Sequence, residues 1–135
     1  MPQFPTINQV VYKDFDTLFD IHPVTRKLNV LTNDDAIVRS VKNLVLTNKG
    51  ERPYQPFLGC DIRNRLFEPA DDGFTEEEIV ENIEEVIGEY EPRAELIDVI
   101  ADVKPDQNSV NVTITFRAIN ATEPTTLNLI LEKVR

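Results

Sequence analysis

Residues 90 to 93 read Tyr-Glu-Pro-Arg, which places a carboxylate and a guanidinium on either side of a proline. Proline lacks an amide donor and disfavours helical geometry in the residue before it, so a helix is expected to end here and the chain to straighten. In an extended segment, side chains alternate, which would send Glu91 and Arg93 to the same side. Such a pair makes charge-assisted hydrogen bonds. It could hold a partner's backbone or brace its own fold, and the spacing alone favours the brace.

Other residue types that commonly perform catalysis are scarce. The single histidine, His22, precedes a proline in a predicted turn, which favours a structural role over a catalytic one. The single cysteine, Cys60, is typical of a small buried residue, and one cysteine with one histidine does not supply a zinc site. No phosphate-binding GxxxxGK[ST] pattern occurs. The sequence therefore predicts no catalytic residues, no metal and no cofactor.

Carboxylates leave one enzymatic alternative open. A glycoside hydrolase uses two carboxyl groups roughly 5 to 10 Å apart across a sugar cleft. A chain with 24 acidic residues always contains some such pair, and a peptidoglycan-cleaving lysozyme would use Glu68 with Glu91 or another acid pair. Sugar sites also present aromatic platforms, yet the chain has no Trp and only three Tyr. A non-enzymatic role is the main interpretation, and a lysozyme is the alternative.

Charge is distributed unevenly along the 135 residues. The net charge is −10, and residues 71 to 91 hold ten acids and no Lys or Arg. This excess would repel a phosphate backbone, so we expect no nucleic-acid partner. The segment is either a solvated helix face or a docking face for a basic neighbour. No run approaches the roughly 20 apolar residues of a membrane span, and residues 1 to 5 do not resemble a secretory signal, so we expect a cytosolic product without a membrane partner.

Two long helices are expected to position the corner. The first should begin near Asp35, after a cap at Asn33 or Asp34. Gly50 is its predicted end. The second begins at the capping box formed by residues 75 to 78. Both show the spacing of one buried helical face. Their apolar positions are Ile37, Val38, Val41, Leu44 and Val45 in the first helix and Ile79, Val80, Ile83, Val86 and Ile87 in the second.

The segment between the two helices is punctuated. Two prolines and two glycines between Gly50 and Cys60 exclude a long regular element there. Residues 61 to 67 predict one or two helical turns, with Leu66 and Phe67 as core anchors.

After Arg93 the apolar period changes to two, which predicts a three-stranded antiparallel meander. The other face of its middle strand is polar, so we expect helices on one side of the sheet only. The predicted inward residues are Ile97, Val99, Ala101 and Val103, then Val110, Val112, Ile114, Phe116 and Ala118, then Leu127, Leu129 and Leu131.

A small hairpin is expected near the N-terminus, with strands at 15 to 21 and 27 to 31 around a turn at 22 to 26. Residues 1 to 13 are interpreted as an arm and residues 14 to 135 as a single domain. The predicted fold class is α+β: two main helices and a short helix packed on a C-terminal three-stranded antiparallel sheet, with the small N-terminal hairpin.

Four motifs follow the first helix, which spans roughly residues 34 to 47, in a defined order. They are Gly50-Glu51-Arg52-Pro53, Phe57-Leu58-Gly59-Cys60, Leu66-Phe67-Glu68 and Tyr90-Glu91-Pro92-Arg93. Over residues 14 to 134 the chain resembles the small baseplate wedge proteins of contractile phage tails, a family with a lysozyme-like label that is shared with type VI secretion, and most of all its T4-type members. The motifs assign structural roles to Gly50, Arg52, Pro53, Gly59, Leu66 and Phe67.

The resemblance implies a structural subunit of the virion tail baseplate, assembled in the host cytoplasm. It implies that Glu91, Pro92 and Arg93 dock the protein on the helical core bundle of neighbouring wedge proteins, with six copies around the tail axis. It also implies a platform for the first ring of the tail sheath protein, where an exposed sheet edge accepts a strand. The residues expected at or near the sheath contact are Leu127, Leu129 and Leu131.

Overall fold

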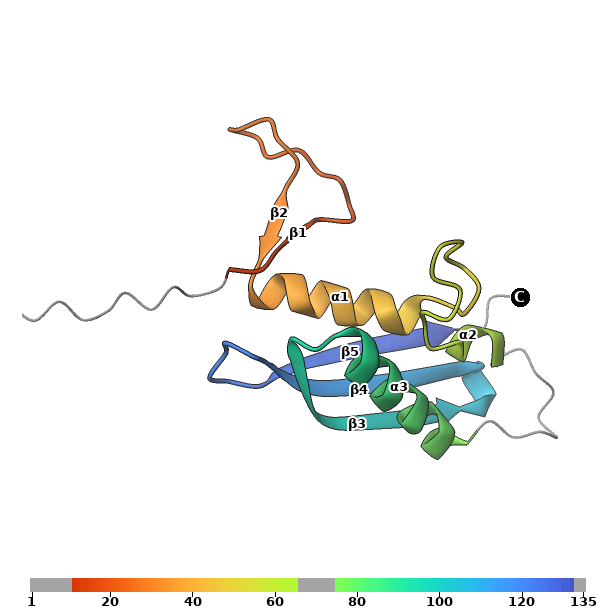
Figure 1. Ribbon diagram of the computed structural model, residues 1–135. Helices are drawn as coiled ribbons and strands as arrows, with labels where there is room; N and C mark the ends of the chain where they lie inside the picture. The colour runs from red at the N-terminus through yellow and green to blue at the C-terminus, as the bar shows by residue number, and fades with distance from the viewer. Residues whose placement is uncertain (1–10, 66–74, 133–135) are drawn as a thin grey trace, which may run out of the picture.

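The body of the molecule has two layers, with helices covering one face of a three-stranded antiparallel sheet (Figure 1). The computed structural model describes residues 11 to 65 and 75 to 132, and the fold class is the predicted α+β. Predictions for residues 1 to 10, 66 to 74 and 133 to 135 lie outside the described residues. Within the described ranges, none of the helices combines the length and apolarity that crossing a bilayer requires.

Helix α1 spans Asp34–Leu46 and buries the predicted apolar stripe, with Val38 partly buried. Asn33 is its N-cap residue but makes no side-chain cap hydrogen bond. The predicted span of roughly residues 34 to 47 is confirmed, but Gly50 is not the residue that ends the helix. Thr47 already has extended geometry, while its amide and its hydroxyl both donate to the carbonyl oxygen of Asn43 and close the last turn.

Helix α3 spans Glu76–Tyr90 and begins at the predicted capping box. The Glu78 amide donates to Thr75 Oγ1, and the Thr75 amide donates to the Glu78 carboxylate, both at 3.3 Å. Two amides that lack partners inside the helix are therefore satisfied. The short helix α2, Ile62–Arg65, lies between α1 and α3 in the sequence and buries Ile62.

The sheet has the order β3-β4-β5, with β3 at Ala94–Lys104, β4 at Ser109–Ala118 and β5 at Thr125–Glu132. All five predicted inward residues of β4 are buried. The prediction that Ile97 faces the core is wrong, because the β3–β4 register shifts between Leu96 and Asp98 and Ile97 is exposed. A β-bulge inserts one extra residue and reverses the alternation beyond it.

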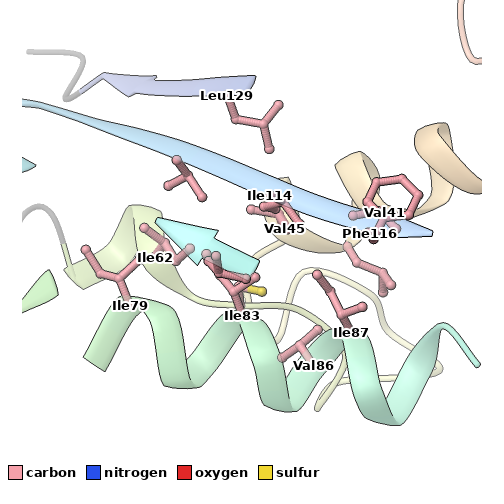
Figure 2. Close-up of a cluster of buried hydrophobic side chains, with 14 of the residues drawn as sticks. Val41, Val45, Ile62, Ile79, Ile83, Val86, Ile87, Ile114, Phe116 and Leu129 are labelled. Atoms are coloured by element: carbon pink, nitrogen blue, oxygen red, sulfur yellow. The ribbon is translucent and has the colours of Figure 1, made fainter. Parts of the chain in front are cut away.

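The core lies between the sheet and the helices α1 and α3 (Figure 2). Phe116 on β4 is its largest fully buried side chain. Six further fully buried side chains are isoleucines from α1, α2, α3 and β4, namely Ile37, Ile62, Ile79, Ile83, Ile87 and Ile114.

A hairpin stands away from the sheet, beyond the N-terminal end of α1 (Figure 1). Its strands are β1, Lys13–Phe15, and β2, Val30–Thr32, and an isolated bridge joins Ile21 to Leu28. The predicted strand at 15 to 21 is therefore wrong, except at its two ends. The Phe19 amide donates to the Asp16 carbonyl and Phe19 has a φ of 54°, so the chain turns where the apolar alternation suggests extended geometry.

Candidate docking site at the corner between α3 and β3

The corner is a tight turn that links α3 to β3. The Glu91 amide donates to Ile87 O at 3.0 Å, and the Ala94 amide donates back to Glu91 O at 3.1 Å. The prediction that α3 ends before Pro92 is confirmed. The prediction that the chain then straightens is wrong, because Pro92 and Arg93 occupy the two central positions of this turn. Proline suits the first of those positions because its φ is already fixed near the required value.

The turn brings Glu91 and Arg93 into a bidentate ion pair. Arg93 Nε lies 2.6 Å from Glu91 Oε1, and Arg93 Nη2 lies 2.8 Å from Oε2. Ser40 on α1 donates its hydroxyl to the same Oε2. The Glu91 side chain is 2% exposed and that of Arg93 is 27% exposed. Both carboxylate oxygens are thus used inside the chain, so Glu91 braces the fold, and the outward surface of the corner belongs to Pro92 and Arg93.

The electrostatics of this pair agree with its geometry. Burial alone would raise the pKa of Glu91, but hydrogen bonds from Arg93 and Ser40 outweigh burial and lower it below its usual value. The same hydrogen bond to Glu91 raises the pKa of Arg93, against the opposing effect of burial. Glu91 is therefore a stable carboxylate, unlike the general acid of a glycosidase, whose pKa is raised.

The corner also contacts the N-terminal hairpin. The Arg93 guanidinium lies over the ring of Tyr12, with 5.2 Å between Arg93 Cζ and the ring centroid. This distance is within the range of a cation–π interaction. Arg93 therefore contacts the residue directly before β1, while the carboxylate it binds is hydrogen-bonded to α1. Neither Ser40 nor Tyr12 is predicted from the sequence, because no local pattern signals a contact 51 or 81 residues away.

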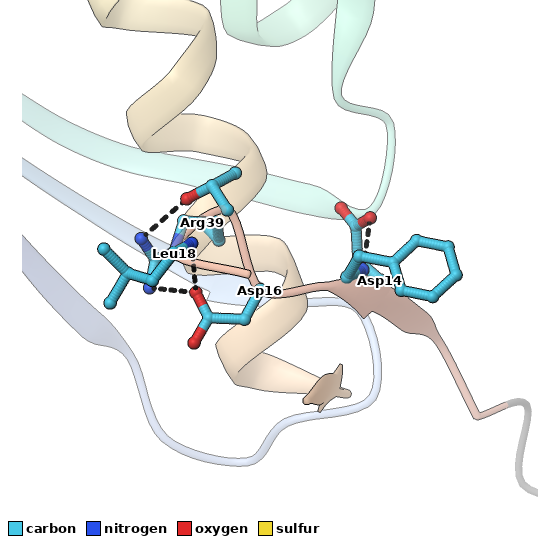
Figure 3. Close-up of polar contacts among 6 residues, drawn as sticks. Asp14, Asp16, Leu18 and Arg39 are labelled. Carbon is cyan, nitrogen blue, oxygen red and sulfur yellow. Dashed lines mark hydrogen bonds and ion pairs between the residues drawn. The ribbon is translucent and has the colours of Figure 1, made fainter. Parts of the chain in front are cut away.

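A second tie joins the hairpin to α1 (Figure 3). Arg39 Nη2 lies 3.2 Å from Asp16 Oδ1, and Arg39 Nη1 donates to Thr17 Oγ1 at 3.0 Å. Asp16 Oδ1 also accepts the Leu18 amide at 3.2 Å. The segment of the hairpin directly after β1 is thus fixed to α1 by an ion pair and hydrogen bonds.

An open groove of about 530 Å³ lies beside the corner. Pro92, Ile119 and Ala121 supply its apolar lining, and Glu95 and Arg117 supply an ion pair on neighbouring strands. Arg117 Nε lies 3.1 Å from Glu95 Oε2. The outer surface of Pro92 therefore continues into a concave surface with apolar and charged parts.

The leucines of the strand predicted near the sheath contact point inward, as the alternation predicts. Leu129 and Leu131 are buried, and Leu127 is partly buried against the core. Their side chains therefore hold β5 on the body, and only the main chain and the opposite face of β5 are available to a partner.

The predicted structural residues of the loop after α1 have different environments. Gly59 has a φ of 128°, and a Cβ there would lie 2.3 Å from Thr47 O, so only glycine fits. Gly50 has a φ of 83° but open space around it. Arg52 and Pro53 are exposed in this loop. Leu66, Phe67 and Glu68 lie outside the described residues.

The residues considered for catalysis have structural environments. His22 Nδ1 accepts the amides of Val24 and Thr25 at 3.2 and 3.3 Å, which stabilises the hairpin turn. Burial raises the pKa of the Cys60 thiol to about 12, so this thiol is a poor nucleophile. Among residues 11 to 65 and 75 to 132, no three His, Cys, Asp or Glu side chains are grouped to hold a metal ion.

A braced corner and a helix-covered three-stranded sheet together define a small α+β protein. A family model described as "Baseplate wedge protein gp25" matches residues 32 to 123. The chain therefore belongs to the baseplate wedge protein gp25 family.

Individual relatives agree with this family. The baseplate wedge protein gp25 of Enterobacteria phage T4 is 34% identical over 87 residues, which cover 62% of this chain and 65% of the relative. The matched part is thus slightly under two thirds of that protein. A chain of the six-fold symmetrised anti-feeding prophage baseplate aligns with a TM-score of 0.65 and 26% identity, covering 84% of this chain and 90% of its own length.

A further solved structure shares the fold. It is a Geobacter sulfurreducens protein named as a candidate tail lysozyme, with a TM-score of 0.64 and 24% identity. The alignment covers 76% of this chain and 92% of that protein.

Proposed function

We propose that this chain is a structural wedge subunit of a contractile phage tail baseplate, which docks on the core bundle of neighbouring wedge proteins and supports polymerisation of the first sheath ring. Family membership supports the baseplate role. The proposed contact with the sheath is supported by the difference between the two edges of the sheet. The proposed location is the virion tail baseplate, after assembly in the host cytoplasm. The six-fold symmetry of the anti-feeding prophage relative supports six copies around the tail axis.

The β3 edge of the sheet is protected against a further strand. Its bulge at Ile97 interrupts the regular ladder, and the Val103 amide donates to Glu76 Oε1 on α3 at 3.0 Å. Bulges and covered amides are common devices that prevent strand addition at an edge.

The β5 edge is regular by contrast. Its eight positions pair with β4 without a register shift, and its outward face carries the exposed residues Asn128 and Ile130. Among the described strands, β5 has no neighbour on its other side. We therefore assign strand addition by a sheath subunit to β5, with main-chain hydrogen bonds as the source of affinity.

The corner is the proposed contact with the wedge core bundle. Pro92 and the exposed part of Arg93 form its outer surface, while Glu91 acts indirectly by fixing the Arg93 guanidinium. The groove beside Pro92 extends this surface. The acidic exposed face of α3 disfavours a nucleic-acid partner, which agrees with a protein-only contact.

Arg93→Ala tests the corner in wedges reconstituted from the purified wedge proteins of the same phage. Incorporation should fall about tenfold or more, since a charge-assisted hydrogen bond at an interface contributes about 1.5 to 3 kcal/mol. Arg63→Ala removes an exposed arginine from α2 and is the matched control. Because Arg93→Ala also leaves Glu91 without its partner, Pro92→Glu is the second variant, which keeps the ion pair. Normal incorporation of Pro92→Glu would overturn direct docking at the corner.

Ile130→Lys tests the sheath contact at β5. A charged side chain on an edge strand opposes strand addition, so sheath initiation should fall while wedge incorporation stays normal. The matched control is Ile100→Lys, which places the same charge on the outward face of β3. Equal sheath initiation by the two variants would refute the choice of β5.

We propose a non-enzymatic role, because the buried Glu91 carboxylate is held by Arg93 and Ser40, whereas a glycosidase carboxyl faces a sugar across a cleft. A turbidity assay on cell walls tests this directly. Clearing that disappears when a carboxylate is changed to its amide would overturn the proposal.

A further inference from the structure

The hairpin exposes an unusual amount of apolar surface for so short a segment. Between residues 15 and 30, seven large apolar side chains are exposed, from 43% for Leu28 to 84% for Val24. The seven are Phe15, Leu18, Phe19, Ile21, Val24, Leu28 and Val30. Single exposed apolar residues are ordinary on a protein surface, but contiguous ones mark interaction sites.

Four of these side chains form two facing pairs in the hairpin. Phe15 pairs with Val30 in the β1–β2 ladder, and Ile21 pairs with Leu28 in the isolated bridge. Leu28 lies two positions before Val30, just outside β2, so the two pairs follow one another along the hairpin. We call Phe15, Ile21, Leu28 and Val30 the apolar ladder.

The apolar ladder is held in a defined position relative to the body. Arg39 binds Asp16 and Thr17, and the Asn33 amide donates to Tyr12 O at 2.8 Å. The stacking of Arg93 on Tyr12 adds a third tie. A surface that is already oriented loses less conformational entropy when a partner binds, so these ties favour association.

We propose that the apolar ladder is a docking surface for an apolar patch on a different baseplate protein, and that Glu91 and Arg93 orient it through Tyr12. The inference rests on the proposed function, since the partner is taken from the same assembly. Glu91 and Arg93 are positioning residues in this contact. Docking at the corner itself is a separate contact that the experiment distinguishes.

Charge specifies the partner further. The turn at residues 22 to 27 carries Arg26 and Lys27 and no acidic residue, although the whole chain has a net charge of −10. The partner's apolar patch is therefore expected to have an acidic rim next to this turn.

A second copy of this chain fits less well. Two ladders facing each other would make a two-fold contact, whereas the copies in a six-fold ring all face the same way. The family match begins at residue 32, so the ladder lies outside the part of the chain that the family model describes. The contact would therefore be an addition to the shared wedge role.

The test uses the full chain and wedges reconstituted from the purified wedge proteins of the same phage. The double variant Ile21→Thr, Leu28→Thr places β-branched residues at both positions but makes the ladder polar. Incorporation should fall about tenfold or more, while the melting temperature stays within about 2 °C of wild type. The matched control Ile100→Thr changes an exposed isoleucine on the outer sheet face and should incorporate normally. Normal incorporation of the double variant would overturn the inference.

Tyr12 tests the positioning step. Tyr12→Leu removes the ring under Arg93 and should reduce incorporation, whereas Tyr12→Phe keeps the ring and should restore it. If both Tyr12→Leu and Tyr12→Phe fail equally, the ring does not position the hairpin and this step is refuted.

The pattern across variants separates the two proposals. Failure of the ladder variant with normal Pro92→Glu supports the inference and refutes direct docking at the corner. Failure of Pro92→Glu with a normal ladder variant supports docking at the corner and refutes the inference. A photo-crosslinking residue at Leu28 should then join the hairpin to another baseplate protein in assembled particles. A cross-link to a second copy of this chain would overturn the proposed partner.

Discussion

The body and the hairpin use the same apolar residue types in opposite ways. Phe116 on β4 is 1% exposed, whereas Phe19 in the hairpin is 66% exposed. In the body, two helices and a sheet enclose their apolar side chains without help from another chain. A two-stranded ribbon is marginally stable alone, and within residues 11 to 65 and 75 to 132 its large apolar side chains stay exposed. The comparison teaches that an apolar pattern predicts burial but does not say whose chain provides the cover.

The largest expected effect tests the body against the hairpin directly. Phe116→Ala should lower the free energy of unfolding by about 3 to 5 kcal/mol, because it leaves a cavity in a closed core. Phe19→Ala should lower it by less than about 0.5 kcal/mol, as an exposed substitution does. Urea denaturation of the isolated protein measures both. Equal losses would mean that the hairpin packs on the body in solution.

The second largest expected effect is within the body, where the stability losses at two glycines of the loop after α1 are compared. Gly59→Ala should cost about 3 kcal/mol, since it combines backbone strain with a clash against Thr47 O. Gly50→Ala has open space around it and should cost only about 1 to 2 kcal/mol for its left-handed backbone. Thermal denaturation ranks the two variants. A larger loss for Gly50→Ala than for Gly59→Ala would show that the close approach of Gly59 to Thr47 O is not fixed.

The corner joins the two regions, and its ion pair has a defined pH dependence. Glu91→Gln should lower the free energy of unfolding by about 2 kcal/mol at neutral pH. The folded-state pKa of Glu91 is lowered, so this contribution is fully present above the ordinary glutamate pKa of about 4.3 and is lost as pH falls through the folded value. Denaturation of both proteins between pH 7 and pH 3 should therefore show their difference shrinking in acid.

The control for this pH series is Glu95→Gln, which breaks an exposed ion pair with Arg117. Its effect should stay below about 1 kcal/mol. A Glu91→Gln difference that grew in acid would contradict the assigned direction of the pKa shift.

The smallest effect concerns the tie between hairpin and corner. Tyr12→Leu should lower the free energy of unfolding by about 0.5 to 1 kcal/mol through the lost cation–π contact. Tyr12→Phe keeps the ring face and should be close to neutral. Tyr54→Leu changes a fully exposed tyrosine and provides the baseline. A neutral Tyr12→Leu would show that the hairpin is energetically independent of the corner.

Local signals in the sequence predict most of the body. Two kinds of signal depend only on residues within a turn or two of each other: the capping box at Thr75 and Glu78, and the buried stripes of both helices. They can therefore be predicted without knowing the fold. The same holds for the alternation in β4. The α+β class follows from these elements alone.

Non-local contacts account for what the sequence does not predict. The bulge at Ile97 arises from pairing with β4, and Ile97 is exposed although it shares the parity of the inward Val99 and Ala101. Glutamate is usually a surface residue, and the burial of Glu91 depends on Ser40, which is 51 positions away. The positive φ of Phe19 likewise breaks a strand that alternation predicts. In each case the local pattern is silent about the contact or turn that decides the outcome.

One contact at the start of α3 makes the protein's local motion observable. Glu76 belongs to the first turn of α3, and its carboxylate accepts the amide of Val103 on β3. Fraying of that turn would release this amide to water. Because amides exchange their protons with solvent only when such bonds open, the deuterium uptake of Val103 reports how often the helix start detaches from the sheet. The resonance of the Val103 amide, measured in the free and in the assembled protein, would then show how this detachment changes when the baseplate forms.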